Sequence, residues 1–307
     1  MAFTAKDVQT LREKTGVGMM DCKKALTEAN GDMDKAIEIL REKGLAAAAK
    51  KSSRIAAEGL VYAYVDSDKK VGAVVEVNSE TDFVAKNADF QAFVKKLAEI
   101  IVEINPADVA TLLDAQYEGN MSVTDVLREK ILVIGENLSI RRFVRYEGNV
   151  VSYIHGGGRI GVLVRFDADE KAAASEELQE CGKDIAMQIA ALSSTYLNKE
   201  SVSAEVIEKE KGILVAQIKI DPKNSNKPEQ IINKMVEGRI NKFYENNCLL
   251  QQAFVKNGDI KVEQYVQDMA KKAGGSMTVA EFVRFEKGEG LQKREDNFAD
   301  EVAGMIK

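Results

Sequence analysis

The 307-residue sequence predicts an α+β fold with a helical N-terminal module, a duplicated core and an inserted helical hairpin. Three observations support this prediction. Apolar residues recur at helical spacing through about the first 45 positions, and β-rich runs begin near residue 59. Two segments of the first half of the chain occur again in the second half, with a longer interval between them.

The first 45 residues are expected to form three short helices. Thr4 is the kind of residue that caps a helix, and the Gly16–Gly18 break ends the first helical pattern. Asn30–Gly31 predicts the turn before the third helix. The Ala-, Lys- and Ser-rich residues 44–54 are expected to be a linker, which gives an N-terminal unit of residues 1–54.

Residues 55–148 are expected to contain two strands, then helices, then a third strand. Leu60–Val65 and Val71–Val77 are β-rich runs separated by a polar turn, which predicts a hairpin. Apolar residues at helical spacing predict a helix over residues 87–104, and a second helix follows it. Leu138–Tyr146 returns to a strand pattern.

This unit occurs a second time in the sequence. Gly72–Val77 resembles Gly161–Phe166, and Phe143–Gly148 resembles Phe282–Gly288. Such internal similarity predicts a duplicated core. The two core units are expected at residues 55–148 and, for the second copy, at residues 149–197 together with 248–285.

The second copy is expected to carry an insertion. The two similar segments start 71 residues apart in the first copy (72 to 143) and 121 apart in the second (161 to 282), a difference of 50. Residues 198–247 account for it, because two amphipathic patterns flank a polar loop with two prolines. An antiparallel helical hairpin is expected, either as an arm that contacts another molecule or as a packed helix pair. Residues 286–307 are expected to form a C-terminal helical tail.

Composition excludes several classes of protein. Forty-three Lys and Arg against 49 Asp and Glu give a net charge of −6, unlike a non-specific nucleic-acid binder. His155, Cys22, Cys181 and Cys248 are too few and too far apart for a Cys/His zinc site. Odd-numbered thiols favour a reducing cytosol, and no apolar run is long enough to span a membrane. A cytoplasmic protein is expected.

The sequence has no motif for nucleotide binding or for nucleophilic catalysis. We find no G-x-x-x-x-G-K-[ST] loop, no G-x-S-x-G elbow and no H-E-x-x-H. Gly156, Gly158 and Gly161 match G-x-G-x-x-G by letter, but a strand follows them instead of the helix that would receive a pyrophosphate. We therefore expect an interaction protein that is not an enzyme, has no cofactor and does not itself bind nucleotide.

Two other functions stay open as alternatives. Lys50, Lys51, Arg54 and Arg141–Arg142 are basic, which is compatible with an RNA-associated scaffold, although such clusters are more often solvated faces. His155 precedes three glycines, a run similar to the oxyanion loop of some esterases. The favoured interpretation of that run is a glycine-rich turn between two strands.

Ser79–Asn87 joins the first hairpin to the first core helix and permits two interpretations. In one, Asp82 caps a helical turn and Phe83 packs beneath it. In the other, the carboxylate and the aromatic ring lie side by side on an exposed turn and enter a groove of another protein. The residue pattern alone does not distinguish the two.

A resemblance to a known family decides between them. Leu11–Leu26, Thr81–Val84 and Ile134–Arg142 are similar, in the same order, to three signatures of the bacterial elongation factor Ts family. With the duplicated core, the helical arm and the tail, the resemblance covers essentially the whole chain. It implies a guanine-nucleotide exchange factor for elongation factor Tu, with an N-terminal module similar to ubiquitin-associated (UBA) domains.

The resemblance also implies which residues contact elongation factor Tu. Asp82 and Phe83, with Thr81 and Val84 beside them, are expected to enter Tu next to its switch region and to disturb its Mg²⁺ and phosphate site. The N-terminal module is expected to dock on the nucleotide-binding domain of Tu, and the chain is expected to bind Tu in both its GDP-bound and nucleotide-free states. The residues expected to make that contact are Val17, Met19, Met20 and Lys23.

One position departs from the family pattern. Gln188 stands where the family usually has a histidine that is thought to act near the phosphate loop of Tu. Glutamine keeps hydrogen-bonding capacity but has no titratable ring. Gln188 is therefore expected to contact the phosphate loop of Tu.

The arm at residues 198–247 is a separate candidate for contact. It is expected to contact either Tu or a second copy of this chain.

Overall fold

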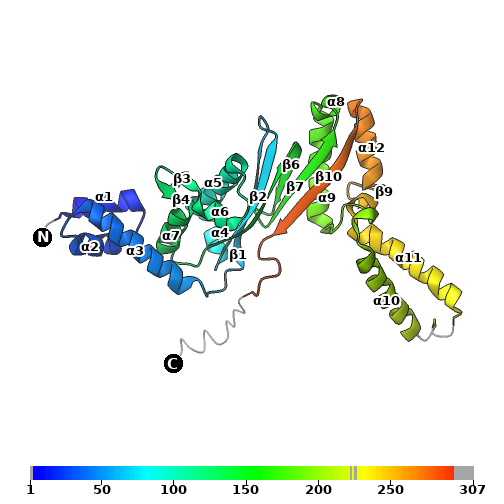
Figure 1. The fold of residues 1–307 in the computed structure, drawn as a ribbon, viewed down its shortest axis with the longest axis horizontal. Helices are drawn as coiled ribbons and strands as arrows, with labels where there is room; N and C mark the ends of the chain where they lie inside the picture. The colour runs from blue at the N-terminus through cyan, green and yellow to red at the C-terminus, as the bar shows by residue number, and fades with distance from the viewer. Residues whose placement is uncertain (1–2, 222, 225–226, 294–307) are drawn as a thin grey trace.

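The computed structural model describes residues 3–221, 223–224 and 227–293 and has an α+β architecture (Figure 1). Two three-stranded antiparallel sheets pack against each other, and helices cover the outer face of each. A three-helix module lies at one end, and a helical hairpin projects from the other. Within the described ranges no helix is long and apolar enough to cross a membrane.

The N-terminal module consists of α1 (Ala5–Thr15), α2 (Met19–Glu28) and α3 (Met33–Lys51). Thr4 caps α1 as expected, and its hydroxyl and the side chain of Asp7 form a reciprocal capping box. Buried apolar side chains from all three helices form one small core. The three helices expected from the sequence are therefore confirmed.

The prediction of a linker at residues 44–54 is wrong for most of its length. Helix α3 continues to Lys51 because alanine and lysine are good helix formers. It packs against α7 (Val123–Ile134), where Gly44 lies against the backbone of Arg128. The Lys51 ammonium donates to the Ile131 carbonyl at 3.2 Å. The module is thus docked on the core.

The first core unit is built on a sheet of order β1-β2-β5, with α5 packed on its outer face. Phe90 and Leu97, on the inner face of α5, are completely buried. The expected hairpin and the expected long helix are confirmed. The elements are β1 (Glu58–Asp66), β2 (Val71–Ser79), α4 (Asp82–Ala85), α5 (Ala88–Ile104), α6 (Val109–Asp114), β3 (Gln116–Glu118), β4 (Met121–Ser122), α7 and β5 (Ser139–Glu147).

The second unit repeats this topology around a sheet of order β10-β7-β6. A short two-stranded sheet followed by a helix occurs in both units, as β3-β4-α7 and β8-β9-α12. The sequence does not predict these strands, because β3, β4 and β8 are too brief to show a period of two and β9 contains a single apolar residue, Ile260. The elements are β6 (Asn149–His155), β7 (Ile160–Ala168), α8 (Glu170–Ala173), α9 (Glu176–Leu192), β8 (Ala253–Phe254), β9 (Asn257–Lys261), α12 (Val262–Ala273) and β10 (Met277–Glu286).

Glycines allow the two sheets to approach closely. A Cβ atom on Gly161 would lie 2.5 Å from Val61 Cγ1, and one on Gly72 would lie 2.7 Å from Val150 Cγ1. Real Cβ contacts are not that short, so neither position has room for a side chain without movement. Val61 and Leu163 are completely buried in the resulting inter-sheet core.

The insertion forms the helical hairpin of α10 (Ala204–Ile220) and α11 (Glu229–Asn247). Its apolar seam consists of five buried residues, Leu214, Ile218, Ile232, Val236 and Ile240. Pro228 directly precedes α11, as expected from its fixed φ. Of the expected C-terminal helical tail, residues 294–307 lie outside the described residues, and residues 287–293 are turn and irregular structure.

Candidate functional site

The turn that carries Asp82 and Phe83 lies directly after β2, at the entry to α5. It forms the single helical turn α4, in which Asp82 and Phe83 face outward and Val84 faces inward. Val84 is buried in the core of the first unit, whereas Phe83 is 76% exposed. The interpretation that Phe83 packs beneath the turn is therefore wrong. An aromatic side chain left this exposed is unusual unless something else covers it.

Lys86 holds the two outward-facing groups of the turn. Its ammonium donates to Asp82 Oδ2 at 2.8 Å and lies 5.6 Å from the centre of the Phe83 ring. The hydrogen bond from Lys86 lowers the pKa of the Asp82 carboxyl, so this group is ionised at neutral pH. The turn thus presents a carboxylate and an aromatic ring together.

Glu136 clamps the backbone of the turn. Its Oε2 accepts the N–H groups of Glu80 at 3.1 Å and Thr81 at 3.0 Å, and its Oε1 accepts the Thr81 hydroxyl at 2.6 Å. Hydrogen bonds to a carboxylate are roughly twice as strong as those between neutral groups. Thr81 is therefore an anchor of the turn, and it also lines the cavity beside it.

A second set of bonds runs in the opposite direction. Glu80 Oε1 accepts the N–H of Asn137 at 2.6 Å and pairs with the Arg54 guanidinium at 3.4 Å. The Asn137 amide donates in turn to the Arg54 carbonyl at 2.8 Å. The turn and the segment after α7 are thus joined reciprocally. Sequence analysis did not connect Glu136 with the turn, because 55 residues separate it from Thr81.

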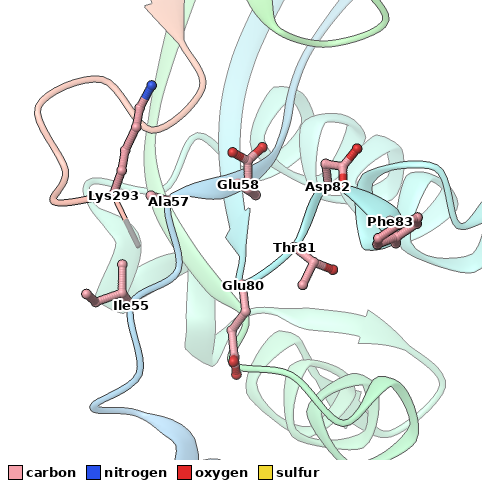
Figure 2. A pocket seen from close by; sticks show the side chains of 8 residues that line it. All are labelled: Ile55, Ala57, Glu58, Glu80, Thr81, Asp82, Phe83 and Lys293. Carbon is pink, nitrogen blue, oxygen red and sulfur yellow. The ribbon is translucent and has the colours of Figure 1, made fainter. Parts of the chain in front are cut away.

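A cavity of about 270 Å³ lies beside the turn (Figure 2). Asp82 and Phe83 come from one side, the chain entering β1 from another, and Lys293 from the segment after β10. The site is therefore assembled from three parts of the chain. The lining residues are Ile55, Ala57, Glu58, Glu80, Thr81, Asp82, Phe83 and Lys293.

The second core unit has the same turn without the aromatic residue. Helix α8 follows β7 as α4 follows β2. Ala172 is buried where the first unit has Val84, and the exposed Lys171 stands where it has Phe83. Because the duplicated fold forms with lysine at this place, the fold does not require an aromatic side chain there. The presence of an aromatic side chain at Phe83 is thus not explained by packing of the fold, which leaves a role at the exposed surface.

The N-terminal candidates separate into two groups. Met19, Met20 and Lys23 are exposed along α2, so they are available to a partner. Val17 is only 3% exposed and belongs to the core of the module. The expectation that Val17 contacts a partner is corrected, because a side chain in the core has no surface to offer.

Gln188 is also buried, on the inner face of α9, with no exposed surface. Its amide donates to Ala253 O at 3.0 Å and to Gln252 Oε1 at 3.2 Å, and its Oε1 accepts the Val255 N–H at 2.7 Å. These bonds satisfy both ends of the amide. The expected direct contact with a phosphate loop is corrected accordingly: Gln188 supports the turn that presents Val255.

The residues behind the two alternative functions have local roles. His155 opens the turn of Gly156–Gly158, whose three residues all have positive φ, so the expected glycine turn is confirmed. Arg141 and Arg142 bind the buried Glu76. The arginine pair is thus engaged inside the protein and does not form a free basic face.

The part of the chain described here offers no group of three or more His, Cys, Asp and Glu side chains that could hold a metal ion. Cys22, Cys181 and Cys248 are free and buried. Burial raises the pKa of each of these thiols, and that of Cys181 to about 12, so none is poised as a thiolate. The exposed Asp82–Phe83 turn is therefore the best candidate for a functional site among the described residues.

Known proteins similar to this chain cover nearly its whole length. The family model described as "Elongation factor TS" matches residues 80–289. Proteins named elongation factor Ts from Clostridium perfringens (strain SM101 / Type A) and Clostridium botulinum (strain Eklund 17B / Type B) are 52% and 51% identical, over 99% of each chain. One from Clostridium kluyveri (strain NBRC 12016) is 49% identical over the same share. The chain belongs to the elongation factor Ts family of translation elongation factors.

Proposed function

We propose that this chain is the guanine-nucleotide exchange factor for elongation factor Tu. It binds Tu in the GDP-bound state, perturbs the Mg²⁺ and phosphate site of Tu, and promotes GDP release and rebinding of GTP. The observation that carries the proposal is the exposed Phe83 beside the ionised Asp82, on a turn that Glu136 holds in place.

The proposed mechanism needs no bond-making group on this chain. Mg²⁺ bridges the phosphates of a bound nucleotide and neutralises their charge, so disturbing its surroundings weakens GDP binding. A factor that binds nucleotide-free Tu more tightly than Tu·GDP lowers the affinity for GDP by the same ratio. Phe83 supplies apolar area for this differential binding, and Asp82 competes for polar partners around the switch region.

Further contacts are proposed on the surfaces at the two ends of the molecule. Met19, Met20 and Lys23 form an exposed strip on α2 that suits docking on Tu. On the helical hairpin, Ile213 and Ile220 are exposed, so the hairpin is proposed as a contact arm. Mass measurement of the free chain and of its mixture with Tu separates contact with Tu from self-association.

The exchange proposal is tested with fluorescent GDP bound to Tu from the same organism. Adding the full chain with excess unlabelled GDP is expected to raise the release rate many-fold. The same chain without Tu is expected to bind no fluorescent GDP. Release that is no faster with the chain than without it would falsify the proposal, whereas RNA binding with a steep salt dependence would favour the scaffold alternative.

Glu136→Gln tests the clamp on the turn. One carboxylate oxygen becomes an NH₂ group, which cannot accept from the backbone N–H groups, so the turn should loosen while the core stays intact. We expect the stimulated release rate to fall about tenfold, because losing one hydrogen bond to a charged group costs about 1.5 kcal/mol and 1.4 kcal/mol is a factor of ten. Glu118→Gln, on an exposed strand of the same unit, is the control and should leave the rate unchanged. Equal rates for the two variants would show that the clamp is irrelevant.

A further inference from the structure

Glu76 is a carboxylate with no exposed surface in the middle of the first sheet. Four donors surround it. Arg142 Nε donates at 2.6 Å, Arg141 Nη1 at 3.0 Å and Asn78 Nδ2 at 3.1 Å. The fourth is the backbone N–H of Gly288 at 2.8 Å, which belongs to the segment after β10. A buried charge of this kind is tolerated only when it is fully paired.

The segment that contains Gly288 is attached at several further points. The Arg142 guanidinium lies 4.1 Å from the centre of the Phe285 ring, and Arg142 Nη2 pairs with Glu289 at 3.1 Å. Arg141 Nη2 donates to the Glu289 carbonyl at 2.5 Å. The segment from Phe285 to Glu289 is thus bound across the first sheet by the two arginines that Glu76 orients.

Backbone geometry fixes the same segment from its other side. Gly288 has φ of +67°, and a Cβ atom there would lie 2.1 Å from the Ala57 carbonyl oxygen. Lys287 forms an ion pair with Glu58. Five residues beyond Gly288, Lys293 lines the cavity next to the Asp82–Phe83 turn. The segment therefore leads from the buried carboxylate to the candidate site.

The duplicated unit shows that this arrangement is not a general property of the fold. At the equivalent place Arg165 on β7 faces Glu281 on β10, so the signs of the charges are exchanged. The side chain of Arg165 is 27% exposed and that of Glu281 is 44% exposed. Arg165 forms ion pairs with Glu281 and with Asp167, both on the same sheet. Arg165 has only donors and cannot accept a backbone N–H, whereas the acid on β2 can, so Glu76 is what allows attachment of the Gly288 segment.

We infer that Glu76 is a positioning residue, which holds residues 285–293 against the first sheet so that they form one continuous partner surface with the Asp82–Phe83 turn. The inference rests on the proposed function for the identity of the partner, elongation factor Tu. Glu76 itself touches no partner, because it has no exposed surface. Its effect is on the affinity for the partner and not on the action of Phe83.

The test compares Glu76→Gln and Gly288→Ala with Glu281→Gln in the full chain. Gly288→Ala displaces the segment but keeps the Glu76 carboxylate and its three side-chain donors, so it carries the test where Glu76→Gln lowers the folded fraction. Glu281→Gln makes the same chemical change at the duplicated position and is the control. Two quantities are measured for each: hydrogen exchange of the amides of residues 286–293, and GDP release as a function of chain concentration.

Both test variants should show faster hydrogen exchange in residues 286–293, with protection in α5 unchanged. The concentration for half-maximal GDP release should rise about tenfold, while the maximal rate stays within about twofold. Unchanged exchange in the segment, or a loosened segment with an unchanged half-maximal concentration, overturns the inference. If the natural chain itself fails to stimulate release, the proposed function fails, whereas hydrogen exchange still decides whether Glu76 holds the segment.

Discussion

Replacing Phe83 by alanine should reduce the GDP release rate stimulated by this chain by about 30-fold or more. Aromatic residues at the centre of an interface commonly lose about 2 kcal/mol or more on truncation, and each 1.4 kcal/mol is a factor of ten. The side chain is 76% exposed, so its removal takes almost nothing from the folded core. The measurement is release of fluorescent GDP from Tu at one fixed concentration of the variant.

Lys171→Ala is the matched control, since Lys171 occupies the equivalent exposed position on α8. It should leave the release rate unchanged. Both variants should unfold at the same denaturant concentration as the natural chain, because surface substitutions seldom change stability by more than about 0.5 kcal/mol. A normal release rate for Phe83→Ala would remove the aromatic ring from the mechanism.

Gly161→Leu should destabilise the folded protein by about 3 kcal/mol, at the upper end of the range for adding bulk to a packed core. Gly161 faces Val61 and Val74 across the two sheets, and even a Cβ atom would lie 2.5 Å from Val61 Cγ1. A leucine therefore separates the sheets or distorts them. The free energy of unfolding is obtained from denaturant titration followed by circular dichroism.

Gly212→Leu is the control for this substitution. Gly212 lies on the exposed side of α10 with no other atom within 4 Å of the position of a Cβ. The same change should stabilise this helix slightly, by up to about 1 kcal/mol, because leucine is the better helix former. A similar loss at both positions would mean that close approach of the sheets is not the cause.

Local signals in the sequence predicted much of the fold. The cap at Thr4 and the long apolar face of α5 depend on residues a few positions apart, and both were read correctly. The repeat of Gly72–Val77 in Gly161–Phe166 predicted the duplicated sheets, since the same pattern of side chains supports the same pairing of strands. The hairpin of α10 and α11 followed from its two amphipathic patterns.

Predictions failed where the deciding contact is distant in sequence. The sequence predicts a linker at residues 44–54, but α7 packs against α3 and the helix continues to Lys51. Val17 and Gln188 were expected at the surface, yet each is buried by residues from other helices or loops. Whether a residue is polar or apolar does not by itself determine whether its side chain lies at the surface or in the core.

By itself, the sequence determined the classes of elements, the repeat and the family signatures, because all of these are carried by local spacing or by residue identity. Only the tertiary structure decided that Phe83 faces outward, that Glu136 clamps its turn and that Glu76 binds the segment after β10. The physical reason is that exposure and buried ion pairing depend on which distant segments meet, and tertiary packing within and between the two units settles that meeting.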